Sequence, residues 1–205
     1  MSGRKTGIIM EFNNCSLIIL AGGKSSRMGQ NKAHLRWNAK CFLDIIIEKG
    51  KSLGFGEIVL SGYRGKVSDC FSVEDELKER GPLGGLHACF KAASFEDCFV
   101  ITVDSPLVST ETMRKMLDEH IRGENEVTLL KHGEKTEPLI GIYKREFYRK
   151  IYPVIQNGSA PVFRALDRAD VTNLEIDGIE KEILNINTKD AYEAFLKENE
   201  NNCAV

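Results

Sequence analysis

The segment that most constrains the fold is SLIIL, at 16–20, which is followed almost at once by a glycine pair, Gly22 and Gly23. An apolar run without alternation is typical of a strand buried on both faces, as in a parallel sheet covered by helices. The segments EIVLSG (57–62) and DCFVITVDSP (97–106) have the same character and also end in polar residues. The sequence therefore predicts an α/β protein whose buried strands deliver polar loops to one edge of a sheet.

The spacing of apolar residues, together with the positions of glycine, proline and capping residues, divides the rest of the chain into alternating strands and helices. CFLDIIIEKGKSLG (41–54) fits an amphipathic helix that ends at glycine, and STETMRKMLDEHIRG (109–123) has a Ser/Thr cap and a glycine stop. Helices are also predicted at 81–93, 145–155, 161–168 and 188–200, and strands at 70–75, 125–133, 137–147 and 171–176. We expect residues 1–14 to form a flexible tail or a short extra strand, and residues 15–205 to form a single α/β domain with a mostly parallel sheet.

The composition restricts the classes of function. The 205 residues carry a formal net charge of -2, which argues against bulk electrostatic binding of nucleic acid or of an anionic membrane. No apolar run approaches the roughly 20 residues that span a bilayer. The six cysteines form no CxxC pair, so we expect buried, reduced thiols rather than a disulfide framework or a zinc site, and a cytoplasmic protein.

The loop after the first strand contains the tripeptide GKS at 23–25, which ends many phosphate-binding P-loops. The P-loop spacing requires glycine at position 18, where this chain has Ile18. The dinucleotide pattern G-x-G-x-x-G also fails, because the glycines fall at 22, 23 and 29. The loop is therefore neither of these two nucleotide sites.

The same loop remains suited to phosphate. Gly22 and Gly23 lack Cβ atoms, so phosphate oxygens can approach their backbone N–H groups closely. Arg27 adds a planar fork and Lys32 a compact positive charge. The alternative interpretation is an ordinary strand–turn–helix connection with surface basic residues.

A second signal is Asp104, at the polar tip of the strand predicted at 97–106. In open α/β sheets ligands bind beyond the carboxyl ends of the strands, which makes the loops after Leu20, Leu60, Asp75 and Val103 the informative ones. A strand-end aspartate can cap the next turn. It can also hold Mg²⁺, which neutralises the charge that develops during transfer at a phosphate.

Four stretches together resemble the signature of the nucleotidyltransferases, and within them the molybdenum cofactor guanylyltransferases (MobA-like). These are LAGGKSSRMGQNK (20–32), EDELKERGPLGGL (74–86), VDSP (103–106) and NINT (185–188), and the resemblance runs from about Leu17 to the final helix. It implies a Rossmann-like three-layer domain of nucleotidyltransferase type. It further implies a Mg²⁺-dependent enzyme that transfers GMP from GTP to the terminal phosphate of molybdopterin, or of its molybdenum form, with release of pyrophosphate.

The resemblance also implies roles for individual residues. Arg27, Lys32 and Asp104 would be catalytic, with Asp104 the ligand of Mg²⁺. Asn185 and Asn187 would bind the acceptor. Contacts to GTP would come from Leu20, Ala21, Gly22, Gly23, Lys32, Ser61, Asp75, Gly81, Pro82, Leu83 and Asp104.

The chain departs from the family pattern at two places, and a third position bears on the choice between branches. Ser61 stands where asparagine is usual, and Ser159 lies in a segment that is usually more basic. Asn31 replaces the proline that is usual in relatives acting with CTP or on sugar phosphates, which favours the molybdenum cofactor branch. The open alternatives are a relative that uses CTP or another phosphorylated acceptor, and a non-catalytic nucleotide-binding protein of the same fold.

The expected partners are small-molecule substrates, other proteins of molybdenum cofactor biosynthesis and acceptor molybdoenzymes, with neither nucleic acid nor membrane among them. The four histidines lie at no metal-ligand spacing, so none is given a role: His34, His87, His120 and His132.

Overall fold

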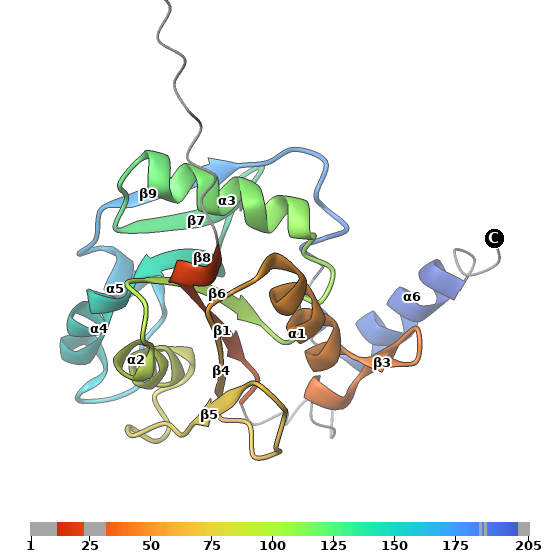
Figure 1. Ribbon diagram of the computed structural model, residues 1–205, viewed down its shortest axis with the longest axis horizontal. Coiled ribbons are helices and arrows are strands. Elements are labelled where there is room, and N and C mark those ends of the chain that lie inside the picture. Colours follow the sequence, from red (N-terminus) through yellow and green to blue (C-terminus); the bar gives the residue numbers. More distant parts are fainter. Residues whose placement is uncertain (1–11, 23–31, 185, 187, 201–205) are drawn as a thin grey trace, which may run out of the picture.

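The computed structural model describes residues 12–22, 32–184, 186 and 188–200. Within them, seven strands form one sheet: β1 (Cys15–Leu20), β4 (Glu57–Ser61), β5 (Phe71–Val73), β6 (Asp97–Thr102), β7 (Val127–His132), β8 (Lys135–Lys144) and β9 (Val171–Glu175). Their order is β5-β4-β1-β6-β8-β7-β9 (Figure 1). Every neighbouring pair is parallel except the pairs of β8 with β6 and β7. The predicted single α/β domain with a mostly parallel sheet is confirmed.

Helices cover both faces of the sheet and complete three layers (Figure 1). One face carries α1 (Phe42–Leu53), α3 (Thr110–Arg122) and α6 (Lys189–Glu200), and the other carries α2 (Pro82–Ala92), α4 (Tyr148–Ile155) and α5 (Phe163–Leu166). The described residues also form the short turns η1 (Phe12–Asn14), η2 (Lys32–His34) and η3 (Arg145–Phe147), and a ribbon of β2 (Arg36–Trp37) and β3 (Lys40–Cys41). The ribbon was not predicted from the sequence.

Strand β1 lies at the centre of the core. All six of its residues are buried, and they alternate between the two helical layers. Leu17 and Ile19 pack with α1 and α3, whereas Ile18 and Leu20 pack with α2 and α4. Burial on both faces explains why the sequence of this strand shows no polar alternation.

Strand β6 ends earlier than predicted. The prediction ran to residue 106, but the strand stops at Thr102, and the N–H of Ser105 donates to the carbonyl of Thr102 at 3.1 Å. This turn places Asp104 just beyond the sheet. Pro106 follows, and it has no N–H with which to continue a ladder.

Strand β8 contains a bulge. Leu129 of β7 pairs with Gly141, but the next residue, Leu130, pairs with Glu137. Residues 138–140 of β8 are therefore left without partners on β7, which suits Pro138 because it has no N–H to donate. The bulge turns Leu139 toward the carboxyl edge of the parallel strands, where it lines a cleft.

The described amino-terminal residues begin with η1, whose first residue packs into the core. Phe12 is buried, with its ring centroid 4.6 Å from that of Phe55, while residues 1–11 lie outside the described part of the chain.

The described cysteines are free thiols; three of them are buried, and burial raises the pKa of Cys89 and Cys98 to about 12. Cys41 and Cys70 are only half-buried, contrary to expectation. No described helix is both long and apolar enough to cross a membrane.

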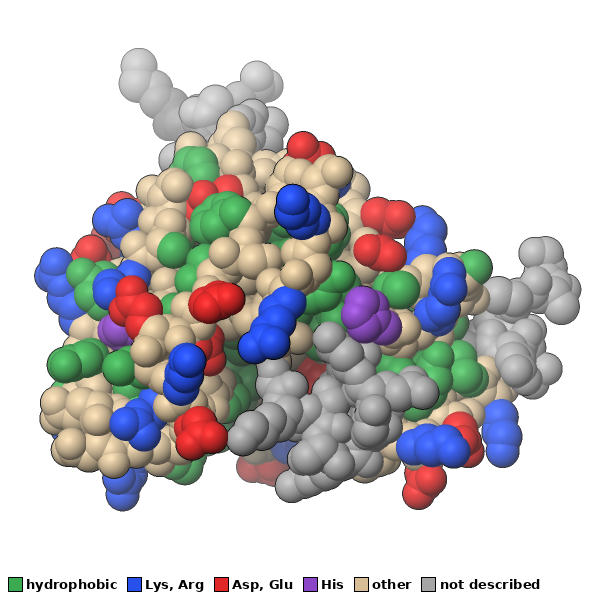
Figure 2. Space-filling view, turned by 90° about the horizontal axis from the view of Figure 1, so that it is seen from below, with side chains coloured by type: hydrophobic (Ala, Val, Ile, Leu, Met, Phe, Trp, Pro, Cys, Tyr) green, Lys and Arg blue, Asp and Glu red, His purple; other side chains and the backbone are tan. Residues whose placement is uncertain are grey.

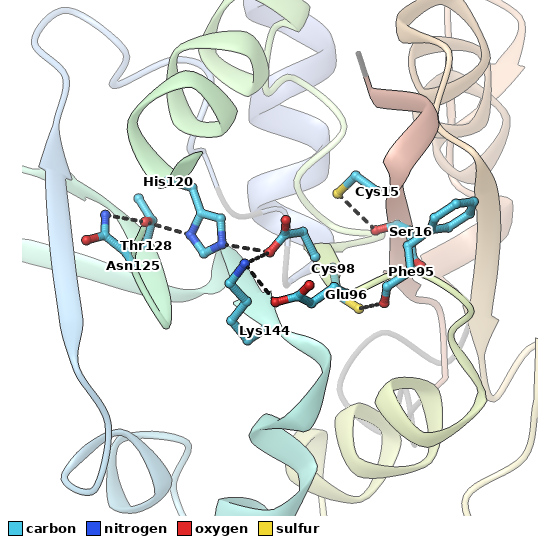
Figure 3. Close-up of polar contacts among 10 residues, drawn as sticks. Cys15, Ser16, Phe95, Glu96, Cys98, His120, Asn125, Thr128 and Lys144 are labelled. Carbon is cyan, nitrogen blue, oxygen red and sulfur yellow. Dashed lines mark hydrogen bonds and ion pairs between the residues drawn. The ribbon is translucent and has the colours of Figure 1, made fainter. Parts of the chain in front are cut away.

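A polar network lies at the amino-terminal edge of the sheet, opposite the loop-bearing edge (Figure 3). His120 is buried, and its ring nitrogens lie 2.9 Å from Thr128 Oγ1 and 3.1 Å from Asp97 Oδ1. Lys144 Nζ lies 2.8 Å from the same Asp97 oxygen. Burial by itself would raise the pKa of Asp97, but the hydrogen bonds from His120 and Lys144 outweigh it and lower that pKa. The network joins α3, β6, β7 and β8, which gives His120 a structural role.

We expect Asp97→Asn to reduce the free energy of unfolding by about 2 kcal/mol at pH 7, because two charge-assisted hydrogen bonds are weakened. A carboxylate whose pKa is lowered in the folded state stabilises above its unfolded pKa, and this contribution disappears as the pH falls through the folded pKa. Urea unfolding at pH 7 and at pH 3 measures both effects. The exposed Asp177→Asn is the control, and an equal loss at both pH values would contradict the electrostatic explanation.

Candidate functional site

A cleft of about 870 Å³ opens at the carboxyl edge of the sheet. Six separate parts of the chain contribute its described lining: Leu20, Ala21 and Gly22; Ser61, Gly62 and Arg64; Asp75, Glu79, Gly81, Pro82 and Gly85; Thr102, Val103 and Asp104; Leu139; and Ser159. Ligands of open α/β sheets bind at this edge.

At one part of the cleft, the chain that leaves β1 runs directly against the chain that leaves β4. The N–H of Ala21 donates to the carbonyl of Ser61 at 3.2 Å, which continues the ladder by one residue. A Cβ added to Gly22 would lie 3.0 Å from Gly62 Cα and 3.1 Å from the Ser61 carbonyl oxygen. Gly62 itself has a φ of +65°. Glycine at both positions therefore permits two backbones to touch and leaves the cleft open.

We expect Gly22→Ala to separate these two backbones by a few tenths of an ångström, and thus to weaken nucleotide binding and lower Tm by a few degrees. Differential scanning fluorimetry with and without GTP measures both effects. Gly158→Ala is the matched control, because a Cβ at Gly158 would meet no atom within 4 Å. Equal behaviour of the two variants would contradict the close approach as the reason for Gly22.

Asp104 lies at one side of the cleft and is 8% exposed. Its carboxylate accepts a hydrogen bond from the Thr102 hydroxyl, whose oxygen also lies 3.0 Å from Ser105 Oγ. One carboxylate and two hydroxyls make a hard, oxygen-only donor set, which suits Mg²⁺ bound jointly with waters and substrate phosphates. No cluster of three or more His, Cys, Asp or Glu side chains that could hold a metal occurs in the described ranges. Asp104 thus fits a magnesium ion that shares its ligands with a substrate.

Asp75 lies across the cleft, against the first turn of α2. Its Oδ1 is buried and has no hydrogen-bond partner among the described residues. Burial raises the pKa of this carboxyl. The carboxylate lies close to Gly84 and Gly85: Cβ atoms added there would be in ordinary contact with it, at 3.7 Å from Oδ2 and 3.4 Å from Oδ1. A buried acceptor without a donor is costly, which marks Asp75 as a group prepared for a ligand with N–H donors.

Ser61 is 4% exposed and lies beside Asp75. A Cβ on Gly85 would lie 2.4 Å from Ser61 Oγ, so this side chain is directed at α2. Burial raises the pKa of the neighbouring Cys89 thiol, and the Ser61 hydroxyl partly opposes this effect. The hydroxyl is therefore committed to helix α2, and Asp75 is the more available hydrogen-bonding group on this wall.

The outer rim comes from the loop that precedes α2 and from the segment after α4. Gly81 has a φ of +64°, and a Cβ there would lie 3.2 Å from Ser159 Oγ. The Arg80 guanidinium donates to the carbonyl of Gln156 at 3.4 Å. This hydrogen bond joins two parts of the chain that are 76 residues apart in sequence.

The cleft brings together Leu20, Ala21, Gly22, Ser61, Asp75, Gly81, Pro82 and Asp104 of the predicted nucleotide-binding set. Leu83 is not among the lining residues, because its side chain is fully buried between α2 and the sheet. Lys32 begins η2. Gly23, Arg27, Asn185 and Asn187 lie outside the described residues.

The cleft also contains residues that the predicted nucleotide-binding set lacks, among them Thr102, Glu79 and Leu139. Thr102 is a polar residue at the end of an apolar strand, a signal that could have found it. Leu139 had no such signal, because only the bulge of β8 directs it into the cleft.

Figure 2 shows acidic and basic side chains interspersed on the described part of the face seen from below. No broad patch of one sign stands out among the described residues on this face, in agreement with the net charge of -2. This distribution gives no support for bulk nucleic-acid binding there.

Residues 17–171 match the family model of the MobA-like NTP transferase domain. A probable molybdenum cofactor guanylyltransferase of Carboxydothermus hydrogenoformans is 29% identical over 194 residues, which cover 91% of this chain and 97% of the relative. One from Pelotomaculum thermopropionicum is 31% identical over 180 residues, with coverages of 83% and 86%. In fold, the chain resembles molybdopterin-guanine dinucleotide biosynthesis protein A from Archaeoglobus fulgidus, with a TM-score of 0.77, 22% identity and coverages of 91% and 99%.

Proposed function

Because the chain belongs to the family of MobA-like NTP transferase domains, we propose that it transfers GMP from GTP to the terminal phosphate of molybdopterin or of its molybdenum form. The observation that carries the proposal is the cleft that joins Gly22, Asp75 and Asp104, which come from three different loops. The named relatives, probable molybdenum cofactor guanylyltransferases, support this choice of substrates. In keeping with such substrates, the protein would work in the cytoplasm.

The reaction joins an oxygen of the acceptor phosphate to the α-phosphorus of GTP and breaks the bond from the α-phosphorus to the bridging oxygen of pyrophosphate. The acceptor oxygen is already ionised, so no strong general base is required. The chain's contribution is positioning and charge neutralisation. The backbone beside Gly22, together with Arg27 and Lys32, would hold the phosphates.

Asp104 would hold Mg²⁺, which supplies positive charge next to the transferring phosphate and the pyrophosphate. Thr102 donates to the Asp104 carboxylate and keeps it directed into the cleft. On the opposite wall, Asp75 would accept hydrogen bonds from the N1–H and N2–H₂ groups of guanine, a pair of donors that cytosine lacks. Asn185 and Asn187 would bind the pterin of the acceptor.

Purified protein incubated with molybdopterin, Mg²⁺ and each of GTP, CTP, UTP and ATP tests the proposal. We expect pyrophosphate and a pterin dinucleotide to form with GTP at a rate at least tenfold above that with CTP, in line with a site built to bond a base edge. Lys32→Ala should lower turnover and Lys24→Ala should leave it unchanged. Preference for CTP would contradict the guanine assignment, and tight GTP binding without turnover would indicate a binding protein.

A further inference from the structure

Lys49 of α1 has an unusual environment for a lysine. Its ammonium group is directed at two backbone carbonyls, that of Pro106 at 2.7 Å and that of Val108 at 2.8 Å. Burial lowers the pKa of Lys49, and only the charge of Glu182 opposes this effect. Exposed lysines normally keep the ammonium in water, so the desolvation here is offset by specific contacts.

The two carbonyls belong to the loop that carries Asp104. This loop runs from Thr102, where β6 ends, to the start of α3, and it has no regular structure that would satisfy its carbonyls. Buried backbone carbonyls need hydrogen-bond donors, and the Lys49 ammonium donates to two of these carbonyls at once. Val108 is fully buried, so the loop packs onto the core as well as onto the lysine.

Glu182 holds the far end of the same loop. One carboxylate oxygen accepts from the N–H of Ser109 and from the hydroxyl of Thr112, both at 2.8 Å. Ser109 is the N-cap of α3, with its Oγ accepting from the N–H of Thr112 at 3.1 Å. A carboxylate at a helix N-terminus is also favoured by the helix dipole.

The segment that contains Glu182 returns to Asp104 itself. The N–H of Ile186, a fully buried residue, donates to the backbone carbonyl of Asp104 at 3.3 Å. Ile186 lies between the two asparagines proposed to bind the acceptor. The loop of Asp104 is thus tied on one side to α1 and on the other to the segment of the proposed acceptor site.

We propose that Lys49 and Glu182 are positioning residues that hold the loop 103–109 in place, and with it the Asp104 carboxylate at the side of the cleft. The proposal rests on the proposed function, because it assigns the pair a role in placing Asp104 toward Mg²⁺. Neither side chain lines the cleft, so the pair acts through the loop rather than on the substrate.

The test compares Lys49→Met, which keeps the apolar stem but removes the ammonium, with Lys51→Met on the same helix. Lys51 is the matched control because it pairs with Asp69 at the surface, at 2.8 Å. Hydrogen–deuterium exchange of the peptide 102–113 reports on the loop, and electron paramagnetic resonance titration with Mn²⁺ in the presence of GTP reports on the metal site. Lys49→Arg, which restores a bidentate donor, and Glu182→Gln complete the series.

For Lys49→Met we expect faster exchange of the loop, Mn²⁺ binding weakened about tenfold and a lower kcat, with the KM for GTP unchanged and partial recovery in Lys49→Arg. Glu182→Gln should act in the same direction. Faster exchange with unchanged Mn²⁺ binding and kcat would overturn the positioning role, as would equal effects of Lys51→Met. If the wild-type protein fails to transfer GMP, the proposed function fails, while the exchange and Mn²⁺ measurements still decide the role of the pair.

Discussion

Asp104→Asn is expected to reduce Mg²⁺-dependent nucleotidyl transfer by roughly 100-fold or more while the protein remains folded. The amide has nearly the shape of the carboxylate and keeps an oxygen that can accept from the Thr102 hydroxyl. What it removes is the negative charge, and with it the attraction for a divalent cation. Initial rates of pyrophosphate release, measured over a range of Mg²⁺ concentrations, report the loss.

The control is Asp44→Asn, which removes an exposed carboxylate from α1. It should leave both the rate and the Mg²⁺ dependence unchanged. Thermal unfolding of both variants separates loss of function from loss of fold. Wild-type turnover by Asp104→Asn would show that this carboxylate is not the metal ligand, and the metal site would have to be sought elsewhere in the chain.

Asp75→Asn is expected to weaken GTP binding by about tenfold or more and to reduce the preference for GTP over CTP. An amide offers one acceptor oxygen and one donor group in place of two acceptor oxygens, so it mismatches paired N–H donors on a base. Isothermal titration with both nucleotides measures the affinities. Glu74→Gln, an exposed neighbour, is the control.

The same substitution should make the free protein more stable. Burial raises the pKa of Asp75, so its ionised form is disfavoured in the folded state. A carboxyl whose pKa is raised in the folded state lowers the free energy of unfolding at high pH. This penalty disappears as the pH falls below the pKa of the carboxyl in the unfolded state. Asp75→Asn should therefore gain stability over the wild type near pH 8, with little gain near pH 4. Reduced stability at pH 8 together with normal GTP binding would indicate an ordinary structural residue.

Much of the fold could be predicted from the sequence because its signals are local. The apolar run at 16–20 proved to be buried on both faces, and Gly54 ends α1 with a φ of +80°, as a glycine stop predicts. The polar tips of the strands identified the edge at which the cleft lies, and Ile18 excluded a P-loop without any structure. Each inference depends on residues close together in the chain.

The cleft itself depends on distances that no local pattern encodes. The sequence determined by itself the order of strands and helices, the polar loops and the residue types that suit phosphate and Mg²⁺. Only the tertiary structure decided that Asp75 is a buried acceptor over two glycines of α2, that the bulge of β8 directs Leu139 inward, and that Lys49 holds the Asp104 loop. The physical reason is that these properties arise from packing between segments distant in sequence, where burial and hydrogen-bond satisfaction are set by neighbours that the chain supplies only after it folds.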